Sequence, residues 1–173
     1  MGKESKSIKE RIITGLFSRF PSIAEQWAKG FKAVESSHIP WTPFTADLSK
    51  CKVALVTTAG VHMKSQEPFD MEDEEGDFSF REISGQSDVA DLMITHKYYD
   101  HSDADRDINI VFPIERLKEM SKRGEIGGLS PRHYGFMGHI VGSKVELLIN
   151  RTAPEIAKRL NDDGADIALL TPG

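Results

Sequence analysis

The sequence holds a single cysteine, no long apolar run and no cluster of basic residues. One cysteine excludes an intramolecular disulfide and fits the reducing cytoplasm. No apolar stretch approaches the roughly 20 residues that span a bilayer, and the charged N-terminus lacks the apolar segment of a secretory signal. A net charge of −5 without a Lys/Arg patch argues against nucleic-acid binding. These absences predict a cytoplasmic protein that binds neither membrane nor nucleic acid.

The composition itself is that of an ordinary globular protein, with 39% apolar and 28% charged residues. Apolar residues recur at helical spacing over 8–20 and again over 23–34, and Pro21 interrupts the pattern between them. We therefore predict an amphipathic helical pair in a first domain, 1–37, which packs on the body of the protein rather than on a partner. A proline-rich linker opens a second domain, 38–173, which is long enough for a core of its own.

Strand-like and helix-like segments alternate along the second domain. Segments rich in β-branched and alternating apolar residues predict strands over 53–57, 78–83, 90–96, 107–113 and 167–170. Strands that alternate with helices predict an α/β fold, with a mostly parallel sheet and flanking helices.

Two helices are expected in this domain. One runs over 114–124, where glycine ends it, and the other over 153–162, where a Thr152–Glu155 capping box begins it. We interpret the glycine- and aromatic-rich stretch 124–139 as a structured loop, and the acidic stretch 66–76 as a surface loop.

The densest group of polar side chains lies within 95–107. Its histidines and carboxylates could hold a divalent metal, but a calcium loop that starts at Asp103 would need glycine and glutamate where this sequence has isoleucine. A polar loop whose side chains cap backbone groups is the simpler interpretation, and we assign no metal ligand. A substrate pocket in which His96 or His101 serves as acid or base is as good an interpretation.

Two further histidines follow a strand or lie in a loop. His62 comes just after the strand over 53–57, and His133 lies in the glycine-rich loop. Carboxyl ends of parallel strands share one edge of a sheet, which would bring His62 and His96 to the exit of the last strand. Cys51 lies at the opposite end of its strand and reads as a buried small hydrophobe. The candidate site residues are His62, His96, His101, Asp103 and His133.

Five long blocks follow one another in the second domain: KVALVTTAGVHMKSQEPFD, GDFSFREI, ITHKYYDHSDADRDINIVFPIERL, GEIGGLSPRHYGFMG and TAPEIAKRLNDDGADIALLTP. Together they resemble the selenoprotein B family, which comprises the glycine, sarcosine, betaine and D-proline reductases. The resemblance begins at about residue 39 and is greatest to the short, proline-reductase-type subunit. Several blocks in one order are a more specific signal than a single short motif.

The resemblance implies a reductase that cleaves a C–N bond in an amino acid or a related amine. In this family a selenocysteine, or a cysteine in some relatives, follows the strand that ends in Leu-Thr-Pro-x, and UGA encodes selenocysteine. We therefore expect that the chain is truncated at that position, directly after Gly173, and that residues 1–173 alone are inactive. The chain itself would carry no cofactor. The implied partners are a subunit with a pyruvoyl group and a dithiol or thioredoxin-type reductant.

Two other functions remain open from the sequence. A binding or scaffold protein could keep the fold without the nucleophile, and the nucleotides after the Gly173 codon distinguish it from a reductase. A metal-dependent enzyme could use the residues from His96 to Asp107, which metal analysis of the purified protein tests. An apolar last strand with an unpaired edge also leads us to expect self-association of the chain into a homo-oligomer.

Overall fold

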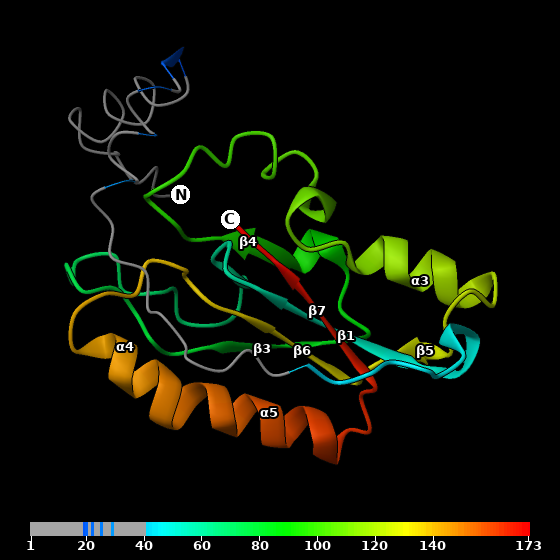
Figure 1. The fold of residues 1–173 in the computed structure, drawn as a ribbon. Coiled ribbons are helices and arrows are strands. Elements are labelled where there is room, and N and C mark those ends of the chain that lie inside the picture. The colour runs from blue at the N-terminus through cyan, green and yellow to red at the C-terminus, as the bar shows by residue number, and fades with distance from the viewer. Residues whose placement is uncertain (1–18, 21, 23–24, 26–28, 30–40) are drawn as a thin grey trace. The chain divides into compact units, whose positions relative to one another are not determined.

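The computed structural model describes residues 19, 20, 22, 25, 29 and 41–173 (Figure 1). Its contacts divide the chain into two units, Met1–Thr45 with Lys97–Asp100, and Ala46–His96 with His101–Gly173. The predicted helical pair lies almost wholly outside the described residues. Within the described part, no helix combines the length and the apolar character that crossing a bilayer requires. The second unit carries the elements that position the candidate site.

Short strands and helices alternate along the second unit. In chain order they are η1 Leu48–Lys50, β1 Lys52–Thr57, β2 Val61–Met63, β3 Arg81–Ser84, η2 Val89–Asp91, β4 Leu92–Ile94, η3 Ile108–Ile110, α3 Ile114–Lys122, β5 Gly128–Leu129, β6 Arg132–Gly135, α4 Lys144–Leu147, the π-helical turn η4 Leu148–Thr152, α5 Ala153–Asp162 and β7 Ile167–Thr171. Their alternation confirms the predicted α/β class.

Strand β1 lies at the centre of a five-stranded sheet. Strands β5 and β6 pair with one of its edges and β7 pairs with the other, all three in the parallel sense. Strand β3 pairs with β6 in the antiparallel sense. Strands β2 and β4 form a separate antiparallel ribbon. The main sheet is therefore mixed, and β2 and β4 do not belong to it.

Helices α3 and α5 lie on opposite sides of the main sheet (Figure 1). Successive side chains of a strand point to opposite faces. On the α5 side, Tyr134, Phe136 and Ile156 form a buried cluster, against which Val56 packs. On the α3 side, the buried hydroxyl of Thr57 donates to a main-chain carbonyl just before α3. Each fully buried apolar side chain contributes about 1.5–3 kcal/mol to stability.

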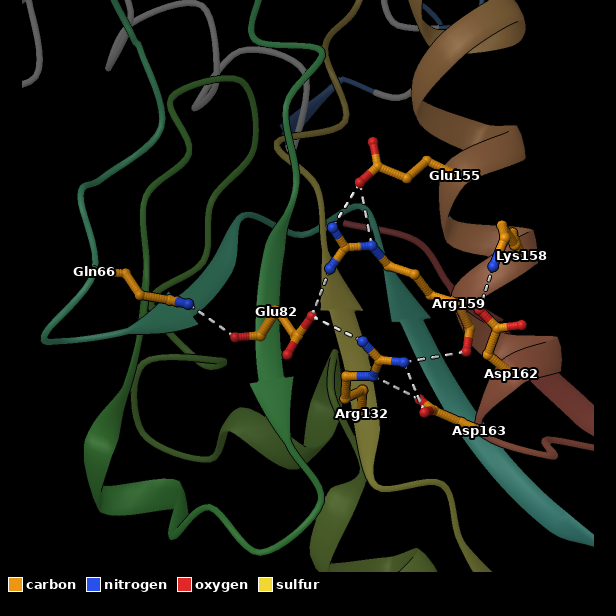
Figure 2. A network of polar contacts seen from close by, with 8 residues as sticks. All are labelled: Gln66, Glu82, Arg132, Glu155, Lys158, Arg159, Asp162 and Asp163. Atoms are coloured by element: carbon orange, nitrogen blue, oxygen red, sulfur yellow. Dashed lines mark hydrogen bonds and ion pairs between the residues drawn. The ribbon is translucent and has the colours of Figure 1, made fainter.

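A network of ion pairs fastens α5 to the sheet (Figure 2). Glu82 of β3 lies 2.9 Å from Arg159 of α5 and 3.7 Å from Arg132 of β6. Arg132 also donates two hydrogen bonds to Asp163, at 2.7 and 2.8 Å. The guanidinium of Arg159 lies over the ring of Phe80, 5.2 Å from its centroid. Paired, planar contacts of this kind hold the helix in one register on the sheet.

Two predicted elements are wrong, one because of a local hydrogen bond and the other because of pairing between distant segments. The stretch 107–113 is not a strand but contains the 3-10 turn η3, because the Asp107 carboxylate accepts the N–H of Asn109 at 3.0 Å and turns the chain. The glycine-rich stretch 124–139 is not a loop throughout, because β1 and β3 provide pairing edges for the short strands β5 and β6 within it.

The predicted capping box is also wrong, although α5 has the predicted bounds. The backbone of Thr152 is helical, with φ −72° and ψ −46°, and its side chain makes no capping hydrogen bond. The helix enters α5 from α4 through the π-helical turn, so the N–H groups at this point are inside a helix and need no cap. Predictions of β1, α3 and β7 are confirmed.

Candidate active site

Three segments of the main sheet end at the same place. After β1, the N–H of Thr58 donates to the Thr171 carbonyl of β7 at 3.0 Å. The N–H of Gly60 donates to the Phe136 carbonyl, just after β6, at 2.7 Å. Because β1, β6 and β7 are parallel, their carboxyl ends form one edge. This is the edge at which open α/β sheets bind ligands, and we call it the exit edge: residues 57–60, 136–138 and 171–173.

Glycines let the backbones at the exit edge approach closely. A Cβ atom on Gly173 would lie 2.4 Å from the Cα of Ala59, and one on Gly138 would lie 2.4 Å from the Thr58 carbonyl oxygen. Gly138 also has φ +88°, which favours glycine. The chain that leaves β7 is therefore held against the turn that follows β1.

A pocket of about 630 Å³ opens beside the ribbon of β2 and β4. Its lining comes from the β2–β3 connection, from η2 and β4, and from the segment that runs from His101 through η3 to α3. The lining residues are Lys64, Val89, Ala90, Leu92, Met93, Ile94, His101, Ala104, Asp105, Arg106, Asp107, Ile108, Asn109 and Glu115. Seven of these fourteen residues are polar or charged and the other seven are apolar, so the pocket offers both kinds of contact to a small molecule.

Backbone contacts connect the pocket to the exit edge. The N–H of Thr95, which follows β4, donates to the Gly60 carbonyl at 2.9 Å. Ile94, one residue earlier, lines the pocket. Gly60 in turn follows Ala59, against which Gly173 packs. The pocket and the end of β7 are thus neighbours through residues 59, 60 and 94–95.

The polar centre of the pocket is a histidine–carboxylate pair. Nδ1 of His101 lies 2.9 Å from Oδ2 of Asp105, and the N–H of Asp105 donates to the His101 carbonyl at 2.8 Å in the same turn. The imidazole is only 16% exposed. The carboxylate accepts from Nδ1 and so fixes the orientation of the imidazole.

The other polar groups of the pocket belong to local hydrogen-bond systems. The Lys64 amine, just after β2, donates to the Ala90 carbonyl, just before β4, at 2.5 Å. Asn109 donates to Asp107 at 2.9 Å and to Glu115 at 2.8 Å. Hydrogen bonding by Asn109 lowers the pKa of Asp107, which is therefore ionised at neutral pH. The pocket presents groups of both charge signs beside apolar side chains.

The predicted residues other than His101 do not line this pocket. Asp103 lies 2.9 Å from Arg106 on the surface, where both side chains are about four-fifths exposed. His96 is buried, and its Cβ lies 3.1 Å from the position of a Cβ on Gly60, so it backs onto the exit edge. His62 and His96 both lie near this edge, but not as ends of parallel strands, because β2 and β4 are antiparallel and lie outside the main sheet.

His62 is fully buried, with both ring nitrogens bonded inside the protein. Nδ1 lies 2.8 Å from the Met63 carbonyl and must donate to it, so Nε2 accepts from the Thr95 hydroxyl at 2.8 Å. The Phe69 ring meets the imidazole edge-on. Burial lowers the pKa of His62, which keeps it neutral. Its hydrogen bond with the Thr95 hydroxyl holds the chain in place just after β4.

His133 is part of the sheet. Strand β5 pairs with residues 52–53 of β1 and β6 pairs with residues 56–57, so the backbone pairing is interrupted between them. There Nδ1 of His133 accepts the N–H of Leu55 at 2.9 Å, in place of a strand carbonyl. The proton is therefore on Nε2, which has no hydrogen-bond partner. Burial lowers the pKa of His133 to about 4.

The structure also bears on two other kinds of site, a cysteine nucleophile and a metal centre. Cys51 is buried, as predicted, and its thiol donates to the Asp47 carbonyl at 3.3 Å; burial raises its pKa. It lies before β1, at the end opposite to the exit edge. Within the described residues, no three His, Cys, Asp or Glu side chains gather as a metal site would require.

The sequence pattern did not single out Asp105, and it did not show that β6 contributes to the exit edge. The acidic residues at 103, 105 and 107 are alike in sequence, and only the turn that brings residue 105 under His101 separates them. A spacing of i,i+4 between a histidine and a carboxylate is the signal that could have identified this pair. The exit edge depends on pairing between segments more than 70 residues apart, which leaves no local signal.

The sequence matches the profile of the family described as Glycine/sarcosine/betaine reductase selenoprotein B (GRDB) over residues 4–173. D-proline reductase subunit gamma of Acetoanaerobium sticklandii is 45% identical over 133 residues, which cover 77% of this chain and 53% of the relative. Glycine reductase complex component B subunit gamma of Carboxydothermus hydrogenoformans is 32% identical over 135 residues, which cover 77% of this chain and 30% of the relative.

A further relative matches along nearly the whole chain. Betaine reductase complex component B subunit beta of Peptoclostridium acidaminophilum is 26% identical over 177 residues, which cover 98% of this chain and 38% of the relative. The chain thus spans about half the length, or less, of these three relatives. No solved structure matches the chain.

Proposed function

The chain belongs to the glycine/sarcosine/betaine reductase selenoprotein B family, and from this premise we propose that it is a reductase subunit that cleaves a C–N bond in an amino acid or related amine. D-proline, glycine and betaine are the substrates to test first, because the relatives are named for their reductases. We assign the chemistry to the exit edge and the adjacent pocket. The convergence of β1, β6 and β7 beside a pocket with a His–Asp pair supports this assignment.

The nucleophile of the proposed reaction would be a selenocysteine or cysteine joined to β7 directly after Gly173. Such a residue would supply an anion that attacks carbon, while a pyruvoyl group on a partner subunit would activate the amine and a dithiol would supply two electrons. The close packing of Gly173 on Ala59 supports this position, because it directs the chain that leaves β7 along the exit edge. Cys51 is unsuited to the role, being buried at the other end of β1.

The residues of this chain would bind the amine and manage its protons. Cleavage of a C–N bond leaves the bonding electron pair on nitrogen, so a proton must reach that nitrogen. His101, oriented by Asp105, is the group in the pocket that can carry it. The carboxylates of Asp107 and Glu115 favour a cationic substrate, and the apolar lining residues fit its carbon skeleton.

A pair of neighbouring variants tests the role of the pocket. In the complete protein, assembled with its partners and supplied with a dithiol, Asp105→Asn and His101→Gln should lower kcat by about 10²–10⁴-fold. Asp103→Asn, two positions away and on the surface, is the matched control and should retain the rate. Wild-type rates in the Asp105 and His101 variants would refute the pocket as the active site.

A second experiment tests the nucleophile. A UGA codon followed by an open reading frame after the Gly173 codon supports the reductase, whereas UAA or UAG favours a binding or scaffold protein of the same fold. Residues 1–173 alone should not reduce D-proline, glycine or betaine, even with a dithiol and a pyruvoyl protein present. Turnover above background would show that the nucleophile lies among these residues.

Partners are proposed from the relatives' names. Several relatives are named as components of reductase complexes, and we propose that this chain likewise assembles with other subunits, including one with a pyruvoyl group. A cytoplasmic location remains our prediction from cysteine usage. Co-purification of a pyruvoyl-containing polypeptide with the tagged chain would support the assembly.

A further inference from the structure

Two threonine hydroxyls at the exit edge share one acceptor. Thr57, the last residue of β1, donates from Oγ1 to the Val111 carbonyl at 3.0 Å. Thr171, the last residue of β7, donates from Oγ1 to the same oxygen at 2.6 Å. The two threonines are direct neighbours in the β1–β7 register, so their side chains leave the same face of the sheet. A carbonyl oxygen has two lone pairs, and here both are used.

The hydroxyls extend this contact into the turn after β1. Oγ1 of Thr57 accepts the N–H of Ala59 at 3.2 Å while it donates to Val111. The N–H of Thr58 donates to the main-chain carbonyl of Thr171. The last residue of β7 and the turn against which Gly173 packs are therefore tied into one hydrogen-bonded unit.

The shared acceptor, the Val111 carbonyl, lies at the end of a turn that lines the pocket. Val111 is the C-terminal cap of η3 and is buried. Ile108 and Asn109, within that same turn, line the pocket. The Val111 carbonyl thus connects the pocket wall to the end of β7.

Packing alone does not account for threonine at both positions. Valine has the same shape and is at least as good a strand former. A buried hydroxyl is tolerated only when it is bonded, and Thr57 is fully buried. We propose that Thr57, Thr171 and the Val111 carbonyl form a positioning clamp, which fixes the end of β7 to the pocket wall and sets the place of the residue after Gly173. The catalytic part of this inference rests on the proposed function.

The clamp is tested first by NMR on the 173-residue chain. Thr171→Val should move the Val111 carbonyl carbon resonance upfield and speed exchange of the Thr58 N–H roughly 3- to 10-fold, as expected for one lost hydrogen bond. Thr171→Ser keeps the hydroxyl and should leave both signals as in the wild type. Thr152→Val, a buried threonine at the start of α5, is the control and should change neither signal.

The second arm uses the complete protein in its assembled complex. Thr171→Val should lower kcat about 10- to 100-fold at unchanged KM, because the pocket is intact and the nucleophile is displaced. Thr171→Ser should restore the rate. An unchanged Val111 resonance in Thr171→Val, or an equal loss of rate in Thr171→Val and Thr171→Ser, overturns the clamp. A complex that is inactive with wild-type chain refutes the proposed function instead, and the NMR arm still decides the clamp.

Discussion

The face of the sheet beneath α5 and the exit edge are built in different ways. Beneath α5, charged side chains pair with one another: Glu82 contacts two arginines, and Arg132 makes a two-pronged contact with Asp163. At the exit edge, hydroxyls, glycines and backbone groups meet, and no ion pair links β1 to β7 among the described residues. Beside this edge, Leu170 of β7 is 71% exposed. The α5 face is therefore held together by paired charges, whereas the exit edge is held by hydroxyl and backbone hydrogen bonds and leaves apolar surface of β7 exposed.

The largest expected effect on stability is at His133, whose buried side chain is bonded within the sheet and lies outside the pocket. His133→Leu leaves the N–H of Leu55 buried without an acceptor, which should lower the free energy of unfolding by about 3 kcal/mol. His133→Gln retains an acceptor and should lose less. Urea unfolding at pH 7 measures both, and His139→Gln, at a half-buried loop position outside the strands, is the control. Full stability in His133→Leu would return His133 to the list of site candidates.

The same residue predicts how stability depends on pH. The pKa of His133 is about 4 in the folded protein against an ordinary value of 6.5, so the unfolded chain binds more protons between these values. Its contribution to stability is present above pH 6.5 and is lost as the pH falls toward 4. We expect a loss of about 2 kcal/mol between pH 7 and pH 5.

The test for this prediction is urea unfolding at pH 7, 6 and 5. His62, whose pKa burial also lowers, adds to the loss in the same direction. The His133→Gln protein is the control, and its stability should fall less over this range. An identical pH dependence in the two proteins would contradict the inserted, neutral imidazole.

The ion-pair face gives a smaller and graded effect. Arg132→Met removes the contact with Asp163, whose carboxylate is only 10% exposed and whose pKa the arginine lowers. Arg132→Met should lower the urea midpoint clearly more than Lys158→Met does. The latter removes only the exposed ion pair with Asp162 within α5. Equal midpoints for the two variants would show that the network adds nothing beyond ordinary surface pairs.

The exposed side of β7 should affect association and leave stability nearly unchanged. Leu170→Lys places a charge on the most exposed apolar residue of β7, next to an edge that no described strand pairs with. We expect the Kd for self-association to rise at least about tenfold, since burying that charge between copies is unfavourable. Analytical ultracentrifugation measures it. Leu48→Lys, exposed at the other end of β1, is the control and should associate like the wild type.

Local patterns predicted the elements whose structure is set locally. β1 and β7 are short apolar runs, and α3 and α5 show helical spacing, so their bounds follow from neighbouring residues. β5 and β6 form only because β1 and β3 offer edges to a segment rich in glycine. Thr152 carries the letters of a capping box, yet the preceding π-helical turn makes its backbone helical.

The candidate site was predicted only in part, because long-range pairing and burial also decide which side chains form it. His101 follows from its polar surroundings, but its partner Asp105 is chosen by a turn and not by composition. His62 and His133 attracted attention as histidines near strand ends, and burial gives them structural hydrogen bonds. Residue type and charge in the sequence indicate which segments are rich in polar side chains. Turns and long-range strand pairing decide which of those side chains come into contact.

We propose that the nucleophile follows β7 directly and lies at the exit edge. The most direct measurement is alkylation of the complete native protein with iodoacetamide after reduction with a dithiol, with the modified residue located by mass spectrometry. We predict rapid modification of a selenocysteine or cysteine next to Gly173, with Cys51 unmodified while the protein is folded. Modification of Cys51 alone, or a residue other than selenocysteine or cysteine at the position after Gly173, would contradict it.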